Sequence, residues 1–280
     1  MIPAGRLKSN MQFNRNLGDL IEVMKLAATS QFNQFRLREE PSLDFVQLLD
    51  EVFAVLLASG IKSDLLTPNA ALPALILVVS SDEGFLGELN FLLVNKLMDI
   101  KRPQDSVVCV GEQGAHYLRE IEVNFSSFDS PGEKIDPERL GKIRDYILKQ
   151  YLSRAVGSVY VIYSRFINIT SQQTELEALL PLAQDASSSR KPLSNLLIEP
   201  DARSVIKGWI KFWLDFRFYQ IFWSAKLAEF AARIMHLEGS VQELGKINTH
   251  LRMEYFKYLH GLSDKSIREL SASRLLEKNK

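Results

Sequence analysis

The residues from Asp201 to Lys280 constrain the fold most, because this long stretch contains no proline. A helix of roughly 75 residues would span about 110 Å, whereas globular helices average about 11 to 12 residues. A helix of that length cannot be buried inside one compact domain, so we expect it to have a partner along its length. Its apolar side chains step by threes and fours, at Leu227, Phe230, Ile234, Leu237, Val241, Leu244, Ile247, Leu251, Tyr255, Tyr258 and Leu262.

The amino-terminal segment is the predicted partner. From Leu7 to Arg38 it has no proline and a single glycine, Gly18. One line of apolar residues has heptad spacing, and a second line widens the apolar face. The first line is Phe13, Leu17, Leu20, Met24 and Ala27, and the second is Ile21, Ala28, Phe32 and Phe35. After Pro41, the pattern of Ser42–Ser59 is helical again, either as one bent helix or as a second helix.

The middle of the chain alternates between strand and helix patterns. Such alternation favours a mostly parallel sheet in an α/β layer. The predicted strands are Ala74–Ser80, Ser106–Val110 and Ser158–Tyr163, with Gln173–Leu182 as an edge strand. The predicted helices are Asn90–Ile100, Gly114–Glu120 and Pro137–Ser153, and Ala183–Ser194 has loop composition.

We therefore predict an α/β fold in which the two terminal helices form a long antiparallel coiled coil, in addition to a central Rossmann-like α/β domain with a mostly parallel sheet. The amino-terminal coiled-coil helix is assigned to residues 1–59 and the α/β domain to residues 60–200. The carboxyl-terminal helix, residues 201–280, packs with residues 1–59 in this scheme.

The composition argues against several classes of function. The 34 basic residues balance 34 acidic ones, so the chain has no global positive field for nucleic acid. The single cysteine, Cys109, lies in an apolar run and fits a small buried residue in a reducing compartment. Neither a secretion signal nor a membrane-spanning stretch is expected.

Local motifs predict no catalytic, cofactor-binding or metal-binding residues. Gly111–Gly114 follows a strand but lacks the spacing of a dinucleotide fingerprint and the end of a phosphate loop. Ser81–Gly84 offers two carboxylates without a nearby histidine. The four histidines and one cysteine have no zinc-site spacing. The dense aromatic residues between Trp209 and Trp223 favour a core against the α/β domain, although part of them could face a partner.

Seven segments, in the same order, are similar to motifs of the gamma subunit of the F-type ATP synthase. The clearest is the signature Ser-Asp-x-Gly-x-x-Gly-x-Leu-Asn, which Ser81–Asn90 resembles. The departures are Glu83 and Glu88, where the family commonly carries a basic residue and a glycine, and Leu86, where it often has cysteine. They suggest a divergent branch of the family. The seven segments are Leu7–Ser9, Met24–Ser30, Val79–Asn90, Val159–Asn168, Leu179–Leu182, Ile198–Asp201 and Glu229–Met235.

The resemblance implies a noncatalytic rotor subunit of the central stalk. One copy would stand inside a hexamer of alpha and beta subunits, while the α/β domain would rest on the membrane c-ring beside an epsilon-type subunit. The implied location is peripheral, on the cytoplasmic side of a bacterial inner membrane, and no cofactor is implied. The implied contacts with the hexamer are Met24, Arg233, Glu269, Leu270, Leu275 and Leu276.

Two other classes of function stay open at this point. One is an adaptor or scaffold that dimerises through its coiled coil and binds a small molecule in the α/β domain. The other is a diverged enzyme, which the missing acid-base and phosphate-binding residues disfavour. The adaptor predicts a homodimer with a ligand, whereas the rotor predicts one copy per hexamer.

Overall fold

The computed structural model describes residues 3–39, 48, 51–52, 69, 71–181 and 201–278. The chain forms two compact units, one of Met1–Thr29 with Ile234–Lys280 and the other of Ser30–Arg233. The predicted boundaries at residues 59 and 200 and the loop Ala183–Ser194 lie outside the described residues, as does most of Ser42–Ser59. The division into three segments therefore stays a prediction.

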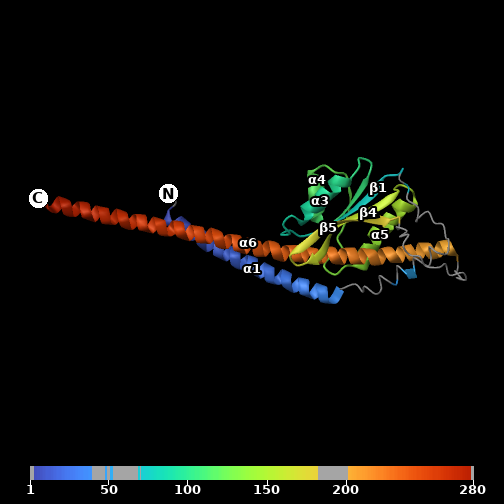
Figure 1. Ribbon diagram of the computed structural model, residues 1–280, viewed down its shortest axis with the longest axis horizontal. Coiled ribbons are helices and arrows are strands. Elements are labelled where there is room, and N and C mark those ends of the chain that lie inside the picture. Colours follow the sequence, from blue (N-terminus) through green and yellow to red (C-terminus); the bar gives the residue numbers. More distant parts are fainter. Residues whose placement is uncertain are drawn as a thin grey trace. The chain divides into compact units, whose positions relative to one another are not determined.

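A five-stranded sheet forms the centre of the second unit, with the strand order β3-β2-β1-β4-β5 (Figure 1). Strands β1 (Ala74–Val79), β2 (Ser106–Val110), β3 (Ser126–Phe128) and β4 (Ser158–Asn168) pair in parallel. The edge strand β5 (Ser171–Leu180) pairs antiparallel with β4. The predicted mostly parallel sheet is thus confirmed.

Helices cover both faces of this sheet, which explains why β1 is apolar at every position. Ile76 and Val78 pack in one buried cluster with α3 (Leu89–Ile100) and α4 (Glu112–Glu120). Alternate strand residues point to opposite faces, and Val79 lines a cavity together with Phe222 of the last helix. The last helix, α6 (Ala202–Lys278), therefore lies on the face opposite to α3 and α4.

The boundaries of the predicted elements differ from the structure by a few residues. β4 continues five residues beyond the predicted end at Tyr163 and turns directly into β5. β3 was not predicted, because its three residues, Ser126–Phe128, are mostly polar and too few to show a period. The helix α5 (Pro137–Leu152) begins as expected for proline in a first turn, after the cap in which Asp136 accepts a hydrogen bond from Glu138 N.

The two terminal helices are continuous and very long. α1 runs over 36 residues, Ala4–Glu39, and α6 over 77 residues, which confirms the single long helix predicted at the carboxyl end. Within the second unit, the buried face of α6 is Ile206, Ile210, Leu214, Phe218 and Phe222. The dense aromatic group is divided as predicted, because Phe218 and Phe222 are buried while Phe212 is half exposed.

Contacts within the first unit show that α1 and α6 run antiparallel there. In the first unit, Lys25 Nζ lies 2.7 Å from Glu238 Oε2, and Leu7 lines a groove with Tyr258. In the second unit, the rings of Phe35 and Phe230 pack edge to face at 5.8 Å. Earlier residues of α1 therefore meet later residues of α6, as predicted for the coiled coil.

The residues of α1 that face α6 differ from the first predicted line. The covered residues recur with heptad spacing and include Ile21, Ala28, Phe32 and Phe35, which is the second predicted line. Phe13 and Leu20 of the first line are more than half exposed. The prediction for this line was wrong for Phe13, Leu20 and Ala27, whereas Leu17 and Met24 are half-buried. Both lines share the same spacing, and spacing alone does not indicate which line meets the partner. The covered line is Leu7, Met11, Asn14, Gly18, Ile21, Lys25, Ala28, Phe32 and Phe35.

Candidate functional site

A second apolar line on α1 lies outside the helix pair. Phe13 is 65% exposed and Leu20 is 56% exposed, and both have the heptad spacing of a packing surface. Val23 and Leu26 beside them are also exposed. Scattered apolar residues are common on protein surfaces, but a line that repeats along several helical turns indicates an interaction surface. We call Phe13, Leu20, Val23 and Leu26 the outer line of α1.

The far part of α6 is also apolar on its exposed side. Met253, Phe256, Ile267 and Leu270 are each at least 47% exposed, and the steps between them are 3, 11 and 3 residues, with 11 equal to three helical turns. Where α1 begins, a groove of about 550 Å³ lies between the two helices and is lined by Leu7, Glu254, Lys257, Tyr258, Gly261, Leu262 and Lys265. This part of the first unit therefore offers both apolar and charged contacts.

One ion pair crosses the covered seam of the helix pair. Lys25 Nζ lies 2.7 Å from both Glu22 and Glu238, and these two carboxylates raise the pKa of Lys25. In return, Lys25 and then Gln242 lower the pKa of Glu238. A charge at a seam position opposes pairings in another register, because a shifted helix would leave it without its partner.

The predicted interface residues fall into three kinds of environment. Met24 is half-buried, and Arg233 is only 6% exposed. Glu269 and Leu270 are exposed, with Glu269 lying 3.8 Å from Lys265. The side chains of Leu275 and Leu276 lie outside the described part of the chain.

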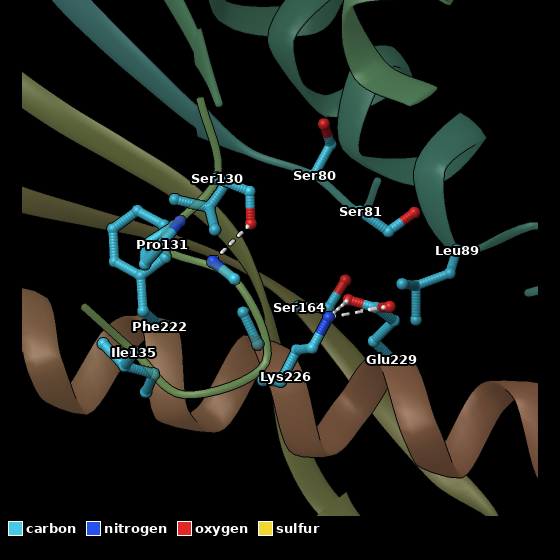
Figure 2. A pocket seen from close by; sticks show the side chains of 13 residues that line it. Ser80, Ser81, Leu89, Ser130, Pro131, Ile135, Ser164, Phe222, Lys226 and Glu229 are labelled. Carbon is cyan, nitrogen blue, oxygen red and sulfur yellow. Dashed lines mark hydrogen bonds and ion pairs between the residues drawn. The ribbon is translucent and has the colours of Figure 1, made fainter. Parts of the chain in front are cut away.

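Arg233 belongs to a cluster of charges in the second unit. Its Nη2 lies 2.9 Å from Glu229 Oε1 and 3.0 Å from Glu83 Oε2 in the loop after β1. Lys226 donates two further hydrogen bonds to Glu229, as the dashed lines in Figure 2 show. Sequence reasoning singled out Arg233 and the pair of carboxylates in Ser81–Gly84, but no local signal connected Glu83 with a residue 150 positions later.

The loop that carries Glu83 is held by its own polar residues. Ser81 N donates to Asn90 Oδ1, and Asn90 Nδ2 donates to Ser81 Oγ at 2.8 Å. Both side chains are buried. These bonds fix the start of α3 against the end of β1, so the serine and asparagine of the signature have a structural role here.

The crevice at the carboxyl ends of β1 and β4 lies where the connections of the sheet diverge to opposite sides. Ligands of open α/β sheets usually bind at such a switch point. Here α6 covers it, with Lys226 and Glu229 beside Ser164 and with the ring of Phe222 beside Pro131 (Figure 2). The space that remains measures about 30 Å³, which is room for one or two water molecules. Side chains of the protein itself therefore occupy this crevice.

The space at the glycine turn Gly111–Gly114, which follows β2, is also occupied by the protein itself, in this case by Ser80. Ser80 Oγ accepts a hydrogen bond from Gly114 N at 3.0 Å and donates to Val110 O at 2.7 Å. A Cβ on Gly111 would lie 2.3 Å from Ser80 O, and one on Gly114 would lie 2.4 Å from Ser80 Oγ. The glycines thus allow the close approach of Ser80 to the start of α4, in agreement with the predicted structural turn.

The remaining reactive side chain in the described ranges, Cys109, is fully buried in β2. Burial raises the pKa of its thiol to about 11, and the hydrogen bond with Ser80 only partly offsets this effect. A thiol of this kind is inert at neutral pH. Among the described helices, none is long and apolar enough to cross a membrane.

Comparison with known proteins places this fold in a family. The family model described as ATP synthase matches residues 5–258. An ATP synthase gamma chain of Clostridium perfringens is 24% identical, with 94% of each chain covered. One of Xanthomonas oryzae is 23% identical, covering 94% of this chain and 96% of that protein.

Solved structures show the same fold. A chain of the Euglena gracilis mitochondrial ATP synthase, in a complex of OSCP, F1 and c-ring, has a TM-score of 0.71 at 14% identity, and 96% and 93% of the two chains are covered. A chain of the Tetrahymena thermophila central stalk and c-ring has a TM-score of 0.61 at 20% identity, covering 79% of this chain and 98% of that one. Because the family match extends over nearly the whole chain, the protein described here belongs to the ATP synthase gamma family.

Proposed function

We propose that this chain is the rotor subunit of the central stalk of an F-type ATP synthase. It transmits torque between a membrane ring that translocates protons or sodium ions and a hexamer that makes or hydrolyses ATP. The observation that carries the proposal is the antiparallel pair of α1 and α6, which covers one heptad line of α1 and leaves the outer line exposed. A helix pair with a further apolar line fits a shaft surrounded by other subunits.

The proposed partners follow from the family. One copy of the chain would stand within a hexamer of alpha and beta subunits, with an epsilon-type subunit and the c-ring near the α/β domain. The matching structures are parts of mitochondrial ATP synthases, namely an assembly of OSCP, F1 and c-ring, a rotor, and a central stalk with its c-ring. The complex would place the chain at the cytoplasmic side of a bacterial inner membrane as a peripheral subunit.

The proposed mechanism needs stiffness and asymmetry in the shaft, while the catalytic sites lie on partner subunits. α1 presents Phe13 and Leu20 outward, whereas the exposed side of α6 carries Met253 and Phe256. Like subunits around such a pair meet different surfaces at any one moment. Each orientation then favours a different nucleotide state by its difference in contact energy.

The proposed contacts with the hexamer are Met24, Arg233, Glu269, Leu270, Leu275 and Leu276. The exposure of Glu269 and Leu270 is compatible with this role. Arg233 would act from a position fixed by Glu229, because its guanidinium is already held on one side. The three-segment organisation, with residues 1–59 and 201–280 flanking the α/β domain of residues 60–200, remains part of the proposal.

The decisive experiment is to purify the complex from its native membrane and to measure its subunit stoichiometry. One copy of this chain per three alpha and three beta subunits is expected. Recovery of the chain alone, or as a homodimer without a hexamer, would overturn the rotor proposal and favour the adaptor alternative.

A truncation tests the proposed role of the tip. Removal of the residues from Ser271 onward is expected to weaken rotation-coupled synthesis and to leave assembly possible, because the α/β domain and most of the helix pair remain. Synthesis at the rate of the full-length chain would show that the assigned tip contacts are unimportant.

A further inference from the structure

Besides the pair of Arg233 with Glu83, two ion pairs of the described residues join α6 to the α/β domain within the second unit. Asp215 of α6 pairs with Arg144 of α5 through Arg144 Nη1 and Asp215 Oδ1. Arg217 of α6 pairs with Glu177 of β5 through two bonds of 2.6 Å, from Nε and from Nη2. The same stretch of helix thus gives one negative and one positive charge to two different elements of the domain.

The two helix residues point to opposite flanks of α6. Positions 215 and 217 are two residues apart, and an α-helix turns by about 100° per residue. The angle between their side chains around the helix axis is therefore about 160°. Asp215 reaches α5 on one flank, and Arg217 reaches the edge strand β5 on the other. The charge of α6 therefore changes sign from one flank to the other, and so does the charge of the domain that faces it.

Both pairs have the geometry of specific contacts. The Arg144 side chain is only 10% exposed, and Arg217 and Glu177 are less than one third exposed. Burial lowers the pKa of Arg144, but the hydrogen bonds of Asp215 and Asp145 outweigh this effect and raise it. The Arg217–Glu177 contact is bidentate, which adds directional specificity to its energy. Gln220 also accepts a hydrogen bond from Arg217 and helps to orient it.

Apolar contacts set the rotational position of α6 only coarsely. The buried face of α6 consists of side chains such as Ile210, Leu214 and Phe218, which keep one side of the helix against the domain, but hydrophobic burial is not directional and tolerates small rotations. Even a small turn of α6 would move both charged pairs out of hydrogen-bonding geometry, because Asp215 and Arg217 hold the helix on opposite flanks.

We propose that Asp215 and Arg217 form a charge key that fixes the rotational position of α6 against the α/β domain and resists its slip under load. The inference rests on the proposed torque-transmitting function and names the residues at which torque passes from the domain into the helix. Asp215, Arg217, Arg144 and Glu177 are positioning residues, and none of them contacts nucleotide.

The test first reverses the charge of each partner of the Arg217–Glu177 pair separately and then exchanges the two residues. Arg217→Glu and Glu177→Arg are each introduced into the complete complex, and the double variant restores opposite charges in exchanged positions. The measurements are ATP hydrolysis and ATP-driven ion pumping in vesicles. Each single reversal is expected to lower the ratio of pumping to hydrolysis about tenfold, and the swap to recover most of it. Lys142→Glu serves as the control, because both side chains of its pair with Glu138 in α5 are well exposed.

Two outcomes would overturn the key. One is a swap that stays as uncoupled as the single variants, and the other is single variants that pump like the wild type. If a charge reversal prevents assembly, Arg217→Gln and Glu177→Gln replace it, and full coupling in both would equally contradict the proposal. Failure of the proposed rotor function would give a different result. In that case the wild-type chain would not be found in a purified hexamer that pumps ions.

Discussion

Glu229 Oε1 lies 2.9 Å from Arg233 Nη2, one helical turn further along α6, and both side chains are less than one tenth exposed. Lys226 contacts the same carboxylate. One buried anion therefore compensates two cations, whereas Glu83, the second partner of Arg233, has a side chain that is 66% exposed. The two carboxylates should contribute very differently to stability.

The first prediction compares Glu229→Gln with Glu83→Gln. Loss of the Glu229 charge leaves the largely buried Lys226 without its carboxylate partner and leaves Arg233 with only the exposed Glu83, and it is expected to destabilise the chain by about 3 kcal/mol. Loss of Glu83 removes an exposed partner and should cost less than about 1 kcal/mol. Urea unfolding of both variants measures the difference, and equal losses would contradict the assigned order.

The second prediction concerns the close approach of Gly111 to Ser80. Gly111→Ala introduces a Cβ 2.3 Å from Ser80 O at a φ of +98°, and we expect it to cost about 2 to 4 kcal/mol. Gly141→Ala is the matched control, because its Cβ would meet its nearest neighbour at 3.5 Å inside α5. That control should stabilise the chain by up to about 1 kcal/mol. Thermal unfolding that ranks the two variants in reverse would refute this account.

The third prediction follows from the raised pKa of Cys109. Because the folded-state pKa of about 11 lies above the ordinary value of 9.0, the unfolded chain loses its thiol proton first as the pH rises. The stability that the neutral thiol contributes is complete below about pH 9 and is lost up to about pH 11, by roughly 2 to 3 kcal/mol. The Cys109→Ala variant should not show this loss of stability with rising pH, and unfolding curves measured at several pH values would test this.

The same pKa predicts slow alkylation of Cys109 in the folded chain. At pH 8 the thiolate fraction is about a hundredfold below that of an ordinary thiol, and burial reduces access further. Mass spectrometry after iodoacetamide treatment should find modification mainly in urea. Equal labelling of folded and unfolded protein would show that Cys109 is accessible.

The fourth prediction separates the outer line of α1 from its covered line. Leu20→Ala should change the stability of the isolated chain by no more than about 0.5 kcal/mol, whereas Phe32→Ala should cost about 3 to 4 kcal/mol. If the outer line contacts partner subunits, Leu20→Ala combined with Phe13→Ala should weaken the association of the chain with the hexamer. Unchanged association in a pull-down titration would count against that surface.

Periodicity in the sequence was sufficient to predict most of the helices and strands of the fold. The long helix of residues 202–278 follows from the absence of proline and the repeat of apolar residues, both of which are local properties. The strands β1, β2 and β4 were predicted because buried parallel strands are continuous apolar runs. β3 lacked such a run, so only its pairing with β2 defines it.

The contacts between elements needed the tertiary structure. Two heptad lines on α1 have the same spacing, and only packing against α6 determined that Ala28 and Phe32 are covered while Leu20 stays exposed. The pairs of Arg233 with Glu83, Arg144 with Asp215, and Arg217 with Glu177 join residues that are 40 to 150 positions apart. The sequence by itself thus determined which segments are helices and strands, because that depends on neighbours a few residues away. The tertiary structure alone decided which of their faces and charges meet, because those contacts depend on how distant segments fold back onto one another.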